Sequence, residues 1–270
     1  MLLVVKRLIL MPAWIYRRSN IEILLIFVIL FLILMDFLPR AIRLLPMMAP
    51  SEESTHLGYS LFSPLAGCSG LLIGFLLNQA QTNLREIKSI VSAEAGRINN
   101  LDRLLTRYGD IGTLEIRDEI FSYIDSIIEE EWNIIGNGQG SHRTHMLWRN
   151  ISKKIMKLDP QTNRQTAIYA DIIKKSEEVA ESREMRIERA TDKLPQLFWV
   201  VIGLCIMALT AVNTLFLPLD SYTLGLKILP ILFGALISLL VITDQPFRGQ
   251  TSIQPDALRK ILISIKSRVE

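Results

Sequence analysis

The sequence has little of what several common protein classes require. It contains only two cysteines in 270 residues. Both Cys68 and Cys205 lie within apolar segments, so we expect neither a disulfide framework nor a cysteine-based metal site. The formal net charge is only +3, which gives no support to nucleic-acid binding. Charges interrupt the apolar run of the first residues, and no small-residue cleavage site follows, so we expect no signal peptide.

Catalytic motifs are also missing from the sequence. Residues 136–140, GNGQG, lack the lysine of a phosphate-binding loop and follow a predicted helix, so we expect no nucleotide site there. His142 and His145 have no third ligand nearby, and we interpret them as loop histidines rather than metal ligands. No nucleophile is accompanied by a plausible base. We therefore expect no enzyme activity, no catalytic residues, no metal and no cofactor.

What the sequence does have is a concentration of apolar residues in a few blocks. Hydrophobic residues make up 50% of the chain, although 21% of its residues are charged. Residues 1–84 are predicted to form an interfacial segment and two membrane spans, at about 21–38 and 60–84. Two further spans are predicted within 194–243. Prolines at 39, 46 and 50 predict a loop over residues 39–60.

The polar remainder of the chain has mainly helical patterns. Residues 85–193 are predicted to form a water-soluble helical domain, and residues 244–270 an amphipathic tail. The predicted fold class is therefore all-α, with four transmembrane helices and a cytoplasmic helical bundle inserted between spans two and three.

The distribution of basic residues predicts the orientation. Lysine and arginine number four before the first span, two in the first loop, none after the third span and five in the tail. Basic residues favour the cytoplasmic side. We therefore expect a multi-pass membrane protein with both termini and the helical domain in the cytoplasm.

One long predicted helix, over residues 63–108, organises the rest of the chain. At 100° per residue, nine of its small or polar residues fall within about 80° of each other and form a stripe. The stripe residues are Ser63, Gly67, Gly70, Gly74, Asn78, Gln81, Arg85, Lys88 and Ser92.

Two interpretations of this stripe stay open. In one, small residues keep a pore wide, amides bind ions or water, and cations attract anions at the cytoplasmic mouth. The pore-lining candidates are then Gly67, Gly70, Gly74, Asn78, Gln81 and Arg85. In the other, the Gly70–Gly74 GxxxG pair lets a neighbouring helix approach closely. An oligomer could satisfy both.

A second long helix, predicted over residues 161–192, separates its charges. Its basic side includes three candidates for binding a cytoplasmic partner, Arg183, Arg186 and Arg189. Its acidic side consists of Glu177, Glu181, Glu184 and Glu188. The alternative interpretation is an ordinary bundle helix whose charged faces are solvated or pair with neighbours.

Several short motifs resemble those of a known family, the bacterial bestrophin-like domain proteins. The motifs are VSAEA (91–95), LDRLLTRY (101–108), EEW (130–132), SREMR (182–186), LP with Trp199 (194–199) and DQPFRG (244–249). The resemblance covers roughly residues 60–265. Its implications are a four-pass membrane protein and, through similarity to bestrophins, a pentameric anion channel lined by the second span.

These observations lead to one leading hypothesis and one alternative. The leading hypothesis is a homo-oligomeric, anion-favouring ion channel in the lipid bilayer, with inorganic ions as permeants. A bestrophin neck is lined by bulky apolar residues, whereas this stripe contains glycines. The alternative is a non-conducting scaffold or sensor that binds a partner through its helical domain.

Overall fold

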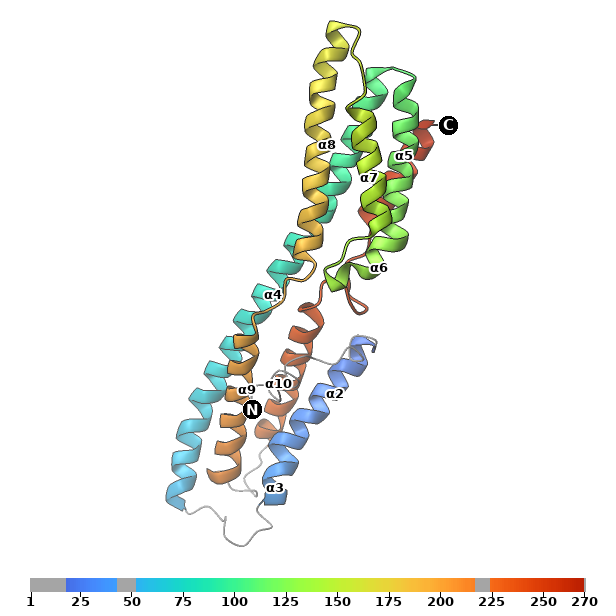
Figure 1. Cartoon of the computed structure of the whole chain (residues 1–270). Coiled ribbons are helices and arrows are strands. Elements are labelled where there is room, and N and C mark those ends of the chain that lie inside the picture. Colours follow the sequence, from blue (N-terminus) through green and yellow to red (C-terminus); the bar gives the residue numbers. More distant parts are fainter. Residues whose placement is uncertain (1–17, 43–51, 217–223, 270) are drawn as a thin grey trace. The chain divides into compact units, whose positions relative to one another are not determined.

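The computed structural model describes residues 18–42, 52–216 and 224–269, and all regular secondary structure in these ranges is helical (Figure 1). The chain divides into two compact units. Unit 1 consists of residues 1–82 and 193–251, and unit 2 consists of residues 83–192 and 252–270. The predicted all-helical class is therefore confirmed for the described part of the chain.

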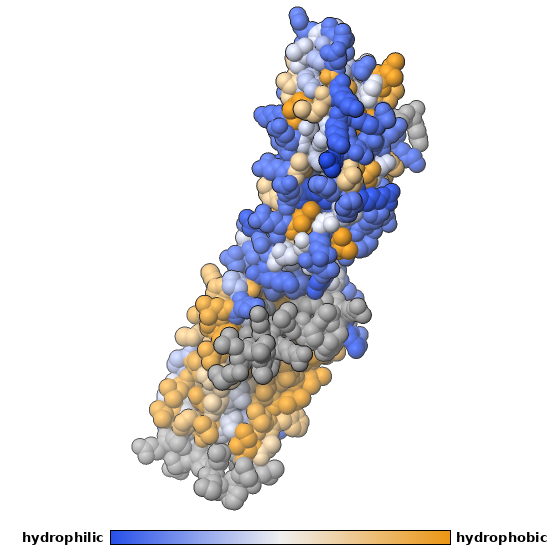
Figure 2. All heavy atoms as spheres, in the orientation of Figure 1, coloured by the Kyte–Doolittle hydropathy of each residue, from blue (hydrophilic) through white to orange (hydrophobic). Residues whose placement is uncertain are grey.

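Unit 1 is built from apolar helices. They are α2 (Asn20–Leu32), the π-helical turn η2 (Ile33–Phe37), α3 (Leu38–Ile42), the first part of α4 (Glu52–Tyr108), α9 (Gln196–Phe216) and α10 (Leu224–Thr243). Helices α2 and α10 pack closely, because a Cβ atom at Gly234 would lie only 2.7 Å from the Cα atom of Val28. Where this unit is coloured in Figure 2, apolar residues predominate on its surface.

Three described helices are long and apolar enough to cross a membrane. They are Asn20–Ile42, Thr55–Tyr108 and Gln196–Phe216. Helix α10 contains a shorter apolar stretch, Ile228–Thr243, and part of the predicted fourth span precedes the described residues of α10. The described residues therefore contain three candidate spans, and the predicted total of four spans stays a prediction.

The prediction of a loop over residues 39–60 is wrong at both ends, because helices extend into this range. Helix α3 continues through Pro39 to Ile42, and α4 already begins at Glu52. Pro46 and Pro50 lie outside the described residues. The helix therefore continues through Pro39, although proline has no backbone N–H group to donate to the preceding turn.

A side chain from another helix explains how Pro39 is accommodated. In an unbroken α-helix the N–H of residue 39 would bond to the carbonyl of Met35. Instead, the buried side-chain amide of Asn213 in α9 donates to the Met35 carbonyl at 2.5 Å. The π-turn just before Pro39 bonds the Leu38 N–H to the Ile33 carbonyl. Backbone polar groups in an apolar unit need such partners.

The predicted unbroken helix over residues 63–108 is confirmed within α4. The helix ends at Tyr108, and the next residue, Gly109, has a φ of +76°, a conformation that glycine adopts without strain. Residues up to Thr82 belong to unit 1 and residues from Asn83 belong to unit 2. A single helix therefore contributes to both units.

Unit 2 is a helical bundle with a polar surface. Besides the second part of α4, it contains α5 (Gly112–Ser126), the π-helical turn η3 (Ile127–Glu131), α6 (Trp132–Ile134), the 3-10 turn η4 (Ile135–Asn137), α7 (His142–Ile155), α8 (Asn163–Arg189) and α11 (Asp256–Val269). Hydroxyl side chains cap α7 and α8: Ser141 accepts from the Thr144 N–H, and Thr162 accepts from the Gln165 N–H.

The predicted amphipathic tail forms α11 and completes the core of unit 2. Leu258 and Ile265 of α11 are fully buried, and they join a core of aliphatic and aromatic side chains from α4, α5, η3, α7 and α8. The Trp132 indole N–H donates to the Ile253 carbonyl at 3.1 Å, which attaches the segment before α11 to the bundle. The C-terminal segment is thus part of this unit's core.

The contact between Asn213 and Met35 leads to a testable prediction. We expect Asn213→Leu to lower the free energy of unfolding by about 1 kcal/mol, because it removes the hydrogen bond from the Asn213 side chain to the Met35 carbonyl. In a Pro39→Ala background the loss should be smaller, since an alanine at this position supplies a backbone N–H of its own. Denaturant unfolding of the detergent-solubilised chain in a double-mutant cycle measures this coupling.

Thr210→Val is the matched control for this experiment. The Thr210 hydroxyl donates to the Ile206 carbonyl of its own helix, at 2.8 Å, so its loss should not depend on residue 39. An equal cost of Asn213→Leu in both backgrounds would contradict the explanation.

Candidate functional site

The first candidate site is the stripe on α4, which lies at the surface of the chain. Gly67, Gly74, Asn78 and Arg85 are exposed, whereas Gly70 is half-buried. Of the other predicted positions, Gln81 is half-buried, and Ser63, Lys88 and Ser92 are exposed. The nine positions therefore form a continuous row along one accessible side of the helix.

The glycines of the stripe do not pack against another helix of the described chain. A Cβ atom built at Gly67, Gly70 or Gly74 would meet nothing within 4 Å. The face of α4 that packs inside unit 1 is a different one, with Ile73 and Leu76 almost fully buried. The GxxxG pair therefore has no partner helix among the described residues, and its packing against another copy of the chain stays a prediction.

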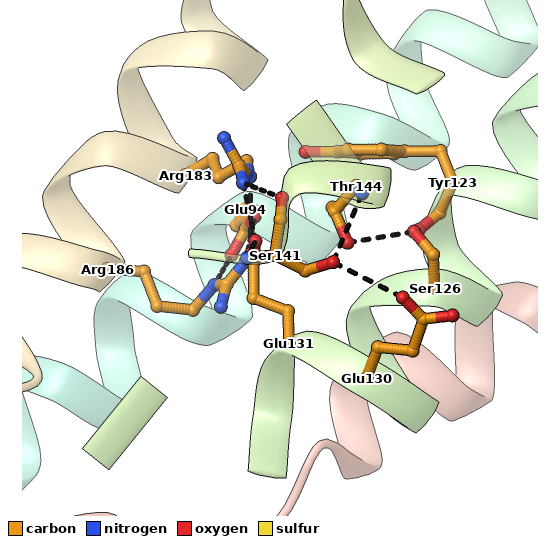
Figure 3. A network of polar contacts seen from close by, with 9 residues as sticks. All are labelled: Glu94, Tyr123, Ser126, Glu130, Glu131, Ser141, Thr144, Arg183 and Arg186. Carbon is orange, nitrogen blue, oxygen red and sulfur yellow. Dashed lines mark hydrogen bonds and ion pairs between the residues drawn. The ribbon is translucent and has the colours of Figure 1, made fainter. Parts of the chain in front are cut away.

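A second candidate site is a cluster of buried charges in unit 2 (Figure 3). The Arg186 guanidinium of α8 donates to Glu94 of α4 at 2.5 and 3.1 Å and to Glu131 of η3 at 2.8 Å. Arg183, one turn earlier in α8, also pairs with Glu131 through two of its nitrogens. The backbone N–H of Ser141 also donates a hydrogen bond to the Glu131 carboxylate, at 2.8 Å.

The π-turn η3 separates three consecutive glutamates into different environments. Glu129 is exposed, and Glu130 pairs near the surface with Arg143 at 2.5 Å. Glu131 is completely buried. Single π-turns inside helices are frequent at functional sites because they redirect side chains locally. Here the turn coincides with the residue that accepts from both arginines.

The charges in the cluster balance and hold each other ionised. Burial raises the pKa of Glu131, but the hydrogen bond from Arg183 and the charge of Arg186 outweigh it, so the pKa lies below the usual glutamate value. Burial lowers the pKa of Arg186, but the charges of Glu94 and Glu131 reverse this effect and raise it. The Arg186 guanidinium also lies 5.5 Å from the centroid of the Trp132 ring.

Neutral polar groups line one side of this cluster. The Ser126 and Thr144 hydroxyls form a hydrogen bond at 3.0 Å, and the Ser141 hydroxyl donates to Glu130 at 3.3 Å. Tyr123 is fully buried, and burial raises the pKa of its hydroxyl. Among the described residues, no group of three or more His, Cys, Asp or Glu side chains could hold a metal ion. The ion pairs of the cluster join α4, η3 and α8.

Comparison with known families identifies this architecture. A family model of the bestrophin-like domain matches residues 25–258, which is most of the chain. The chain belongs to the bestrophin-like family. The membership predicted from the short motifs is therefore confirmed, and together with the three long apolar helices it makes this bestrophin-like chain a membrane protein.

Solved structures share the fold of this bestrophin-like chain at low sequence identity. A bacterial bestrophin homologue from Klebsiella pneumoniae is 12% identical, with a TM-score of 0.62, and the match covers 92% of this chain and 97% of the homologue. A variant of that homologue is 13% identical over 93% and 99% of the two chains, with a TM-score of 0.63. A structure described as a membrane protein has the same identity and TM-score and covers 93% and 98%. A comparison with curated proteins found no match.

The bestrophin-like chain does not present all three predicted partner-binding arginines at its surface. Arg186 is completely buried and Arg183 is 8% exposed, and the glutamates of the cluster occupy both. Arg189 is exposed and pairs with Asp192 at 3.0 Å. Partner binding through Arg189 stays a prediction. Arg183 and Arg186 instead form their ion pairs with glutamates inside unit 2.

Two other buried carboxylates contribute contacts that sequence reasoning missed. Asp102 in α4 is fully buried and pairs with Arg117 at 2.8 Å and with Arg268 of α11 at 3.3 Å. In unit 1, the Asp244 carboxylate accepts from the Leu194 N–H at 2.7 Å. Like the two buried glutamates of the cluster, both aspartates lie in motifs by which the family was recognised.

The buried cluster predicts different outcomes for two adjacent glutamates. Glu131→Gln should lower the free energy of unfolding by about 3 kcal/mol, because it leaves the Arg183 guanidinium without a charged partner and Arg186 with Glu94 alone. Glu130→Gln is the matched control and should cost less than about 1 kcal/mol, since its partner Arg143 is solvent-exposed. Denaturant unfolding of the full chain measures both.

The pH dependence of the same variants gives a second readout. The stability from ionised Glu131 is present above the usual glutamate pKa of 4.5 and is lost as the pH falls through its lower native-state pKa. Glu131→Gln should therefore flatten the acid loss of stability, whereas Glu130→Gln should preserve it. Equal unfolding curves for the two variants would contradict the assigned role of Glu131.

Proposed function

We propose that this chain forms a homo-oligomeric, anion-favouring ion channel in which the stripe on α4 lines the pore. By resemblance to bestrophins the oligomer is a pentamer. The proposed location is the bacterial inner membrane, with both termini and unit 2 on the cytoplasmic side. The observation that supports this function best is the outward-facing row of glycines, amides and cations on a helix whose apolar part is long enough to span a membrane.

The exposed surface of α4 contains both an apolar and a polar part. Leu71 is 78% exposed and Phe75 is 61% exposed, as expected for contact with lipid or another apolar surface. Asn78 is exposed as well, and a polar amide facing lipid would be costly. A water-filled pore at the centre of an oligomer would hydrate Asn78 and leave the apolar residues in contact with lipid or neighbouring copies.

The charge of the stripe favours anions. Arg85 and Lys88 are exposed, and no carboxylate of the described chain forms an ion pair with either of them. Rings of basic side chains raise the local concentration of anions at a pore entrance. The family membership and the shared fold with bacterial bestrophin homologues support the same function.

The pore hypothesis makes a steric prediction. Gly67→Leu should reduce single-channel current in planar bilayers at least several-fold, because a leucine side chain would narrow the bore. Gly67 has open space within the chain, so the fold and the oligomer mass should be preserved. Unchanged current from an oligomer of wild-type mass would contradict the pore assignment.

The neighbouring Cys68 supplies a control for that experiment. Cys68 is also exposed and lies 100° further around the helix, away from the stripe. Cys68→Leu adds a side chain of the same kind at nearly the same depth. Its current should equal that of the wild-type protein.

Selectivity provides an independent test at the polar end of the stripe. Arg85→Glu should lower the anion-to-cation permeability ratio, because it replaces a cation of the proposed mouth by an anion. Glu86→Arg changes an adjacent exposed charge outside the stripe and should leave the ratio close to that of the wild type. Reversal potentials in asymmetric salt measure the ratio. Equal effects of both variants would contradict the proposal that the stripe on α4 lines the pore.

The scaffold hypothesis would be favoured by a different result. A correctly folded oligomer that gives silent bilayers would argue for a non-conducting scaffold or sensor. Of the three arginines first considered for partner binding, only Arg189 is exposed. The structure therefore gives the scaffold less support than the outward-facing stripe gives the channel.

A further inference from the structure

The face of α7 that points away from the bundle is a row of basic side chains. Helix α7 contains no acidic residue. His142, His145, Arg149 and Lys153 follow each other at steps of three and four residues, so they lie on one side of the helix. All four are exposed, whereas Trp148 and Ile151 are on the buried side. We call these four residues the basic row.

Nothing in the described chain neutralises the basic row. Cations at its flanks do have partners: Arg143 pairs with Glu130, and Lys154 pairs with Glu115 and Glu119. No carboxylate of residues 18–42, 52–216 or 224–269 lies within ion-pairing distance of the row itself. The row is therefore a cationic surface open to another molecule.

A matching row of anions lies on α8 of the same unit. Its members are Glu177, Glu181, Glu184 and Glu188, all exposed. The buried ion pairs of Arg183 and Arg186 determine this orientation, because they hold the opposite side of α8 against the bundle. We call these four residues the acidic row. None of them has an ion-pair partner among the described residues.

The two rows match in length, and the charges of Arg149 and Lys153 are opposite in sign to those of the acidic row. Each contains four residues and extends over eleven residue steps, which is about three helical turns. Although α7 and α8 belong to the same unit, no ion pair joins their rows within the described chain. A partner that carries an acidic row of the same length is a second copy of this chain.

We propose that the basic row of α7 docks on the acidic row of α8 in the neighbouring copy of the oligomer. This inference rests on the proposed function in so far as a pore requires several copies. Two different surfaces that meet head to tail generate a ring when the rotation closes. Exposed ion pairs contribute little individually, so the rows determine register and the choice of neighbour more than they contribute affinity.

Charge reversal of each row, followed by reversal of both, tests the proposal on the full chain in detergent. The basic-row variant is His145→Glu, Arg149→Glu and Lys153→Glu. The acidic-row variant is Glu177→Lys, Glu181→Lys and Glu184→Lys. Light scattering coupled to size-exclusion chromatography measures oligomer mass as a function of protein concentration.

Each variant alone should raise the dissociation constant of the oligomer about tenfold or more at low ionic strength, because like charges then face each other. The effect should shrink at high ionic strength. The variant with both rows reversed should return close to wild-type association. That rescue also shows that the single variants weaken docking rather than folding, since both sets of substitutions are then present together.

A matched control reverses three other exposed cations, on α11: Arg259→Glu, Lys260→Glu and Lys266→Glu. This variant should keep the wild-type oligomer mass. The proposal is overturned if single reversals leave the mass unchanged, if the double reversal fails to restore it, or if the control has the same effect. Loss of binding to phosphatidylglycerol vesicles by the basic-row variant, with unchanged mass, would assign the row to lipid instead.

Bilayer recordings of the wild-type protein separate this inference from the proposed function. Silent bilayers together with charge-reversal rescue would reject the channel and retain the interface. Conducting channels together with oligomers that are insensitive to both reversals would retain the channel and reject the interface.

Discussion

The pairing of Arg186 with Glu94 and Glu131 is the interaction on which the organisation of unit 2 depends. All three side chains are completely buried, and a buried charge is tolerated only when an opposite charge of good geometry accompanies it. The pairing therefore sets the rotation of α8 relative to α4 and η3. It also determines which charges of α8 remain outside, namely the glutamates on its opposite side.

Local periodicity predicted the helices well and the burial of charges poorly. The sequence pattern correctly separated α8 into an arginine side and a glutamate side, because that separation depends only on residues a few positions apart. It left open whether the arginines bind a partner, are solvated or pair with neighbours, since the carboxylates that contact Arg186 lie 92 and 55 residues away in the sequence. The motifs that identified the family contained Glu94 and Glu131, but a motif does not reveal which residues meet.

Proline at position 39 illustrates the same limit for backbone structure. A local rule ends the helix there, because proline lacks an N–H group and disfavours helical geometry before it. The structure continues the helix because Asn213, 174 positions after Pro39 and 178 after Met35, supplies the missing donor. The stripe on α4 shows the opposite case: its spacing was predictable, and its exposure became known only from the packing of the other face of the helix.

The position of α11 in the core of unit 2 has a consequence for the order of folding during synthesis. A ribosome delivers the chain from its N-terminus, and the apolar segments α9 and α10 emerge before α11 does. Until then the sites filled by Leu258 and Ile265 are open to water, and Asp102 lacks Arg268 as a partner. Unit 2 therefore completes its native core only after translation has passed α10 and delivered α11.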